Sequence, residues 1–151
     1  MRRWLLVLVA AGALYWSITQ TNIPAPAQTD LQPAPQSLSR DAGDVLRRAF
    51  ETRQSNVQVQ ASGVVVRVLT DDNDGSRHQR FIVKLPDAQT VLIAHNIDLA
   101  PRVSPLAEGD RVEFFGEYDW NDKGGVVHWT HRDPANKHIA GWIKRDGQSY
   151  Q

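Results

Sequence analysis

The stretch that decides the fold is VQVQASGVVVRV at residues 57–68. Its apolar residues return at every second position, which is the period of a half-buried β-strand. The valines fall on odd positions before Gly63 and mainly on even positions after it, at Val64, Val66 and Val68. A glycine at a switch of parity indicates a bulge or sharp bend within a long strand. Small closed barrels need such a bend in the strand that serves both sides of the barrel.

Alternating apolar residues continue downstream in four shorter segments, at residues 81–85, 91–97, 112–120 and 126–130. Turn-forming residues separate these segments, and residues 121–125 form a Gly-rich hairpin loop. A three-stranded meander, a connection and a hairpin predict a mostly β fold, a small five-stranded OB-like barrel. Residues 139–143 are expected to add a sixth edge. An SH3-like barrel or a small sandwich stays open, because alternation does not give the strand order.

The N-terminus has the pattern of an export segment. Arg2 and Arg3 precede an apolar run at residues 4–18, and residues 25–27 have the small-x-small form of a cleavage site. The apolar run is shorter than the roughly 20 residues of a full membrane span. Residues 1–27 are therefore predicted to be a signal peptide or an N-terminal hydrophobic membrane anchor. The domain is expected in the periplasm, or anchored to the inner membrane and facing away from the cytoplasm.

A linker and a helix are expected between this segment and the barrel. Residues 28–37 are Pro-rich and lack a hydrophobic period, as in an extended linker. Residues 38–54 are predicted to form one short amphipathic α-helix with Ser39 as its N-cap. The barrel domain then occupies residues 55–151. The apolar stripe of the helix consists of Val45, Leu46, Ala49 and Phe50.

Composition narrows the function classes. The chain has no cysteine, which excludes disulfides, thiolate metal sites and a lipoprotein anchor. Without Arg2 and Arg3 it carries 15 basic against 17 acidic residues, with the signs interleaved. Nucleic-acid binding depends on clustered Lys and Arg, so a nucleic-acid partner is not expected. The partners left open are a ligand or protein of unidentified chemistry, and the membrane if the N-terminal segment is not cleaved.

Polar residues on the second and third predicted strands suggest a ligand-binding surface. Arg77 to Arg80 and His95 to Asp98 fall on neighbouring strands, and OB barrels bind ligands on this face. A nearby tryptophan could add a stacking platform. We further expect His78, His95 and His128 to gather in one polar patch. The predicted ligand-binding residues are His78, Gln79, Arg80, His95, Asn96 and Trp129.

A second group of residues resembles a metal site without cysteine. His128 and His131 flank a Trp-Thr pair, and Asp133 follows. In a strand this spacing places the two rings on opposite faces, so they converge only if the strand ends near Thr130. A divalent metal at His128, His131 and Asp133 is therefore a hypothesis, and no cofactor is predicted. The acidic residues 71–75 lack the twelfth-position glutamate of a calcium loop and are interpreted as a hairpin turn.

Several segments together resemble a known family of uncharacterised small bacterial proteins. The blocks are residues 71–81, which end in RHQRF, residues 123–131, which end in HWTH, and residues 93–102, 116–118 and 141–143. On these blocks, about residues 57–151 resemble domain of unknown function 3465. The resemblance implies an exported bacterial protein, and it implies no activity.

The function predicted from the sequence is that of an exported, non-catalytic OB-type binding module. No nucleophile elbow, phosphate loop, dinucleotide motif or His-Glu-x-x-His is present, and no catalytic residue is predicted. The alternative is a metal-dependent hydrolase, phosphodiesterase-like, that uses a His/Asp cluster on the barrel. Residues 96–101 faintly resemble the Ile-Asp-x-Pro block of thermonuclease-like barrels, but the rest of that signature is missing.

Overall fold

The computed structural model describes residues 36–151, and their side chains from Gly43 onward. The predicted signal or anchor segment and residues 28–35 of the linker lie outside the described residues. One helix and seven strands follow in the order α1 (Gln36–Glu51), β1 (Val57–Val68), β2 (His78–Lys84), β3 (Thr90–Asn96), β4 (Arg111–Asp119), β5 (Val126–His128), β6 (Trp142–Arg145) and β7 (Gln148–Tyr150). In this part of the chain, no helix has the length and apolarity needed to cross a membrane.

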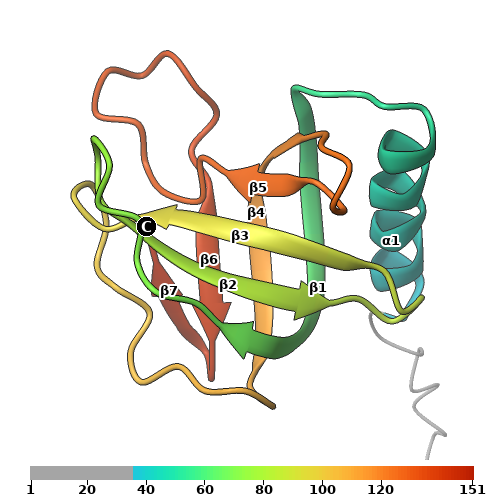
Figure 1. The fold of residues 1–151 in the computed structure, drawn as a ribbon, viewed down its shortest axis with the longest axis horizontal. Helices are drawn as coiled ribbons and strands as arrows, with labels where there is room; N and C mark the ends of the chain where they lie inside the picture. The colour runs from blue at the N-terminus through green and yellow to red at the C-terminus, as the bar shows by residue number, and fades with distance from the viewer. Residues whose placement is uncertain (1–35) are drawn as a thin grey trace, which may run out of the picture. The chain divides into compact units, whose positions relative to one another are not determined.

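Five of the strands close into a barrel. Hydrogen bonding connects them in the order β1-β2-β3-β5-β4, and β4 returns to β1. All neighbouring pairs are antiparallel except β3 and β5, which run parallel. In Figure 1, β1 is the long green strand beside α1, and β2 and β3 cross in front. The predicted mostly β fold, with one short helix and a five-stranded barrel, is confirmed.

Barrel closure takes place within β1. Residues Val57–Val64 pair with β4, and residues Val64–Val68 pair with β2. Gly63 therefore lies at the point where β1 passes from one partner to the other, as its place in the sequence predicts. A Cβ atom on Gly63 would lie 2.4 Å from the backbone oxygen of Lys84 and 2.5 Å from Cγ1 of Val83. Only a residue without a side chain permits this approach of β1 to β2.

The parity of buried residues in β1 differs from the expected one. Val59, Ala61 and Val65 are all buried, so the inward face continues through Gly63 without a switch. Val66 and Val68 are 39% and 40% exposed. The irregularity in the ladder lies after Gly63, between Val65 and Arg67. The run of valines hid this, because a bulge inside a uniformly apolar segment leaves no mark in the pattern.

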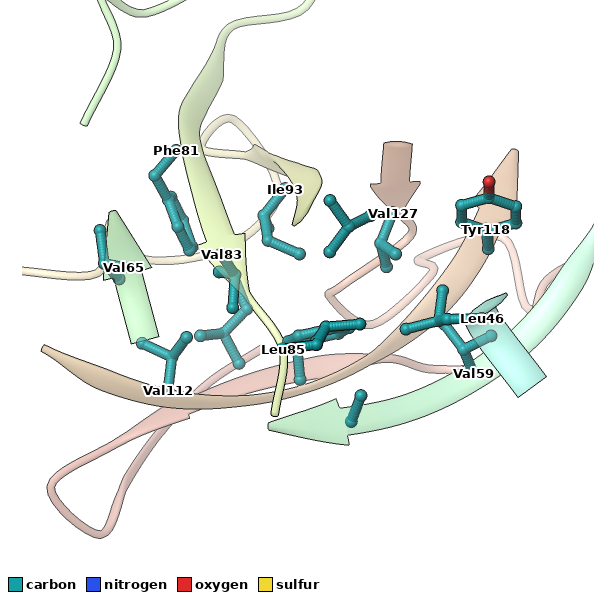
Figure 2. Packing of buried hydrophobic residues seen from close by; sticks show 14 of the residues in the cluster. Leu46, Val59, Val65, Phe81, Val83, Leu85, Ile93, Val112, Tyr118 and Val127 are labelled. Atoms are coloured by element: carbon teal, nitrogen blue, oxygen red, sulfur yellow. The ribbon is translucent and has the colours of Figure 1, made fainter. Parts of the chain in front are cut away.

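The core fills the barrel, and α1 adds to it from one side. Leu46 and Ala49 of α1 belong to the same buried cluster as Val59 and Tyr118. Figure 2 shows Leu46 lying against Val59, with the Tyr118 ring close by. The buried side of α1 is a narrow stripe at every third residue, and Val45 is 41% exposed rather than part of it.

The ends of α1 also differ from the prediction. The helix begins at Gln36 rather than Leu38, so Ser39 lies inside it and is not the N-cap. It ends at Glu51, and Arg53 follows with a φ of 56°. The Gln54 N–H donates to the Ala49 carbonyl at 2.8 Å, which satisfies an otherwise unpaired group at the helix C-terminus.

The last two strands extend the sheet beyond the barrel. β6 pairs with β4 next to β5, and β7 pairs with β6. The expected sixth edge at residues 139–143 is confirmed only in its last two residues, because β6 begins at Trp142. Ile139 precedes the strand and is 61% exposed. The strand starts at Trp142, once the chain has returned to β4 beside Gly141. β7 was not predicted, since three residues carry too little alternation to identify a strand.

The same chemical change should have opposite effects at two glycines. Gly63→Ala should lower the free energy of unfolding by about 1–3 kcal/mol, because the added methyl group meets backbone and Val83. Gly43→Ala, in α1, should raise it by up to about 1 kcal/mol, because alanine favours helix and the nearest atom lies 3.9 Å away. Chemical denaturation of both variants measures the two changes. Equal stabilities would contradict a close approach of β1 and β2 at Gly63.

Candidate functional site

A buried histidine fastens one end of the barrel. His95 lies on β3, and its side chain is 0% exposed. Its Nε2 lies 3.1 Å from the carbonyl oxygen of Pro101, and its Nδ1 lies 2.8 Å from Oγ1 of Thr130. Since a carbonyl can only accept, Nε2 carries the proton and Nδ1 of the neutral ring accepts from the threonine hydroxyl. His95 thereby ties β3 both to the chain after β5 and to the connection before β4.

A buried glutamine beside His95 forms a second set of hydrogen bonds at this end of the barrel. Gln79 of β2 stands directly opposite His95 in the β2–β3 pair and is buried with it. Its Nε2 donates to the Val103 carbonyl at 3.0 Å, and its Oε1 accepts from the Val103 N–H at 2.9 Å. The side-chain amide thus replaces a strand partner for the connection between β3 and β4. Both Gln79 and His95 face inward, so neither is available to a ligand on the outer face.

The other predicted ligand-binding residues also contact the protein itself. Nδ1 of His78 lies 2.7 Å from the Ser76 carbonyl, and Asn96 accepts from the Asp98 N–H at 2.9 Å. Arg80 donates to the Thr70 carbonyl at 3.1 Å. The ring of Trp129 stacks on that of His138, with centroids 3.7 Å apart.

The expected histidine patch does not form. His78 stands opposite Asn96, and Gln79 stands opposite His95, so His78 and His95 point to different faces of the same hairpin. His78 is out of phase with the buried Phe81 and Val83 of β2, whereas His95 is in phase with the buried Val91 and Ile93 of β3. The rings therefore straddle the hairpin, the arrangement expected if the register slips by one. A shift of one residue moves a side chain to the other face.

The structure groups His128 with two carboxylates of β4. Glu117 stands directly opposite His128 in the β4–β5 pair, and Asp119 lies two residues further along the same face. Nε2 of His128 is 2.8 Å from Oδ2 of Asp119 and 3.8 Å from Oε1 of Glu117. All three side chains are half-buried, at 32%, 34% and 22% exposure for His128, Asp119 and Glu117. We call these three residues the Glu117–Asp119–His128 cluster.

The metal ligands predicted from the sequence are not all in this cluster. Of that set only His128 belongs to it. β5 ends at His128, and Trp129 has a left-handed φ of 53°, which breaks the alternation and leaves His131 buried. Nδ1 of His131 lies 2.7 Å from the Arg132 carbonyl. Trp129 lies beside both rings, with centroids 6.3 Å from His128 and 5.5 Å from His131.

Asp133 has a local structural role. Its carboxylate accepts hydrogen bonds from the backbone N–H groups of Ala135, Lys137 and His138 at 2.9, 2.6 and 3.0 Å. These bonds, the one from Ala135 first, lower the pKa of the Asp133 carboxyl below its ordinary value. The residue orders the turn that follows β5, and both of its oxygens are used there.

Glu117 and Asp119 are not among the residues predicted from the sequence, although a signal for both exists. They alternate with the buried Phe114 and Tyr118, which assigns them to the outer face of the strand. The hairpin loop at residues 121–125 then sets which residue of the next strand lies opposite. A count outward from the centre of that loop arrives within one residue of the observed Glu117–His128 pair.

Acid should destabilise the fold through His95. Burial lowers the pKa of His95 from 6.5 to about 4, so between these two values the unfolded chain binds a proton that the folded chain does not. Stability should therefore fall as the pH is lowered from about 6.5 to about 4, by roughly 3 kcal/mol from this residue. Urea unfolding of wild type and His95→Gln at a series of pH values measures the contribution as the difference in slope.

The matched control is His138→Gln, since His138 is exposed. Its stability should follow the wild-type pH dependence. If His95→Gln and wild type lose the same stability over this range, the ring is not held neutral by burial.

Comparison with known families assigns the chain. The model of the family described as protein of unknown function (DUF3465) matches residues 33–151, which is most of the sequence and includes α1 and all seven strands. Comparison with curated proteins gives no match. The resemblance noted in the RHQRF and HWTH blocks is confirmed: the chain belongs to the DUF3465 family.

Proposed function

We propose that this chain is a non-catalytic binding module on an OB-type barrel, exported to the periplasm or to the outer face of the inner membrane. The strand order supports the OB-type assignment, because β1 pairs with both β2 and β4, and β3 pairs in parallel with β5. The basic and apolar N-terminal sequence at residues 1–27 supports export.

One observation carries the binding role, a row of apolar side chains across the outside of the barrel. Ile82 of β2 pairs with Leu92 of β3, and Leu92 pairs with Val126 of β5. All three are half-buried although they point away from the core. Ala94 extends the row on β3. OB barrels bind their ligands on this face, which β2 and β3 dominate.

Charges of opposite sign border this apolar row. Arg67 stands opposite Ile82 on the β1 side, with Arg80 and Lys84 on the same strand as Ile82. On the other side, Val126 stands opposite Asp119 of β4. A polyanion laid across the face would meet carboxylates at one end, so nucleic acid is disfavoured. The face suits a ligand or protein partner that is apolar at its centre and polar at its ends.

The buried polar residues support a structural role in place of catalysis. His95 and Gln79 have every side-chain hydrogen-bonding atom engaged with Thr130, Pro101 or Val103. A general base needs a free lone pair that faces a substrate. These two residues therefore stabilise the barrel end, and the outer face is left for recognition.

Binding to this face can be tested by NMR on the full chain with labelled methyl groups. The probes are short peptides, oligosaccharides and oligonucleotides. A peptide or saccharide should change the methyl chemical shifts of Ile82, Leu92 and Val126. Oligonucleotides should show no saturable binding at low salt. Leu92→Glu should abolish the shifts with an unchanged thermal unfolding midpoint. The matched control is Leu99→Glu, because Leu99 is 44% exposed in the connection between β3 and β4.

Two results would contradict the proposal. The first is turnover of a simple ester, phosphodiester or glycan that His128→Ala abolishes, which would favour the metal-dependent hydrolase. The second is saturable binding of a single-stranded oligonucleotide at the outer face.

A further inference from the structure

The Glu117–Asp119–His128 cluster brings together three groups that commonly bind metal ions. One ligand atom from each residue lies within 4.8 Å of the other two. Among the residues that the structure describes, this is the one place where three such groups meet. An imidazole nitrogen and two carboxylate oxygens form a donor set that suits divalent zinc and neighbouring transition metals.

The histidine nitrogen at the centre of the cluster has no hydrogen bond. Nε2 of His128 is buried as an atom, and although Asp119 Oδ2 is only 2.8 Å away, the angle is not that of a hydrogen bond. A buried polar atom without a partner destabilises the folded state. A metal ion between the three residues would use the free lone pair on this nitrogen.

One backbone group before β1 orients Asp119, and a residue of β1 lies opposite Glu117. The backbone N–H of Asn56 donates to Oδ1 of Asp119 at 3.0 Å, which leaves Oδ2 directed at His128. Gln58 stands opposite Glu117 in the β1–β4 pair, and its Nε2 is also buried without a hydrogen-bond partner. Its side chain therefore lies on the same side of the sheet as that of Glu117. Metal-binding carboxylates are typically oriented by such outer partners.

The local charge also favours a cation. Glu117 and Asp119 lie two residues apart on one face, so their negative charges repel each other. Within residues 43–151, neither carboxylate forms an ion pair with a lysine or arginine, and the one ion-pair partner of both is His128. A neutral imidazole leaves two negative charges uncompensated, and a divalent ion would neutralise them.

We propose that Glu117, Asp119 and His128 bind one divalent transition-metal ion of the zinc class. The three residues supply three ligands, and zinc is usually four-coordinate, so the half-exposed site leaves a position for water or a ligand group. This site adjoins the apolar row, because Asp119 stands opposite Val126. Metal binding here nevertheless does not require that row to bind anything. It shares only His128 with the ligand set that the sequence suggested.

Calorimetric titration of untagged, chelator-treated full chain with Zn²⁺ tests the proposal. We expect one ion bound per chain and a thermal unfolding midpoint that rises with Zn²⁺ concentration, because a ligand of the folded state stabilises it. H128Q and D119N should each weaken binding at least about tenfold, as loss of a metal-site partner typically does. Both replacements keep the size of the side chain, and asparagine can still accept from the Asn56 N–H.

Two control variants separate this site from adventitious binding. H138Q removes an exposed histidine outside the cluster, and D122N removes an exposed carboxylate in the neighbouring hairpin loop. Both should bind Zn²⁺ as wild type does. Co²⁺ should give visible absorption with wild type and lose it with H128Q, a readout that does not depend on stability. Absence of Zn²⁺ and Co²⁺ binding would overturn the proposal and leave His128 and Asp119 as an ion pair. Binding that is unchanged in H128Q and D119N would also overturn it.

Discussion

β1 forms backbone hydrogen bonds with β4 along its first part and with β2 along its second, and the barrel closes only because one strand takes part in both ladders. This shared strand determines which residues lie beside the carboxylates of β4. It brings Gln58 opposite Glu117, and it directs the chain before it toward Asp119, where Asn56 is bound. Gly63 makes the arrangement sterically accessible, because the Lys84 backbone occupies the space of a Cβ.

One end of the barrel is held by polar contacts. A connection of fourteen residues separates β3 from β4, and a segment of this kind must satisfy its backbone groups somewhere. Gln79 does this for Val103, and His95 does it for Pro101. Apolar residues of the same size would fill the volume but leave these backbone groups without partners. Gln79 and His95 are therefore buried as deeply as the apolar core residues, although their side chains are polar.

Much of the fold could be predicted from the sequence, because alternation survives wherever one face of a strand is buried. The inward Phe114 and Tyr118 and the outward Glu117 follow from period two alone. The bulge after Val65 could not be predicted, since valine lies on both sides of it. The inward orientation of His95 also follows from period two, since it has the parity of the buried Val91 and Ile93. Its hydrogen-bond partner could not be predicted, because that threonine lies thirty-five residues away.

The candidate site was predictable in part. The sequence predicts His128 as a candidate ligand on a strand, with His131 and Asp133 further along the chain as its partners. The partners that lie beside it are on the preceding strand. Spacing in the sequence identifies residues that are neighbours along one strand. In a sheet, however, side chains also meet across strands, and the hairpin register decides which of them do.

β5 and β6 occupy successive positions along the same edge of β4, and the chain between them leaves and returns at nearly one point. There the Gly141 N–H donates to the His131 carbonyl at 2.9 Å, and a Cβ on Gly141 would lie 2.0 Å from the Trp129 oxygen. In Figure 1 this excursion is the orange-red loop that stands clear of the strands. Because a backbone hydrogen bond holds the two ends of this loop side by side, the length of the loop is independent of the barrel geometry. For protein engineering, the exposed tip at residues 134–138 is thus an attachment point for a foreign peptide or reporter, which would leave every ladder of the sheet unchanged.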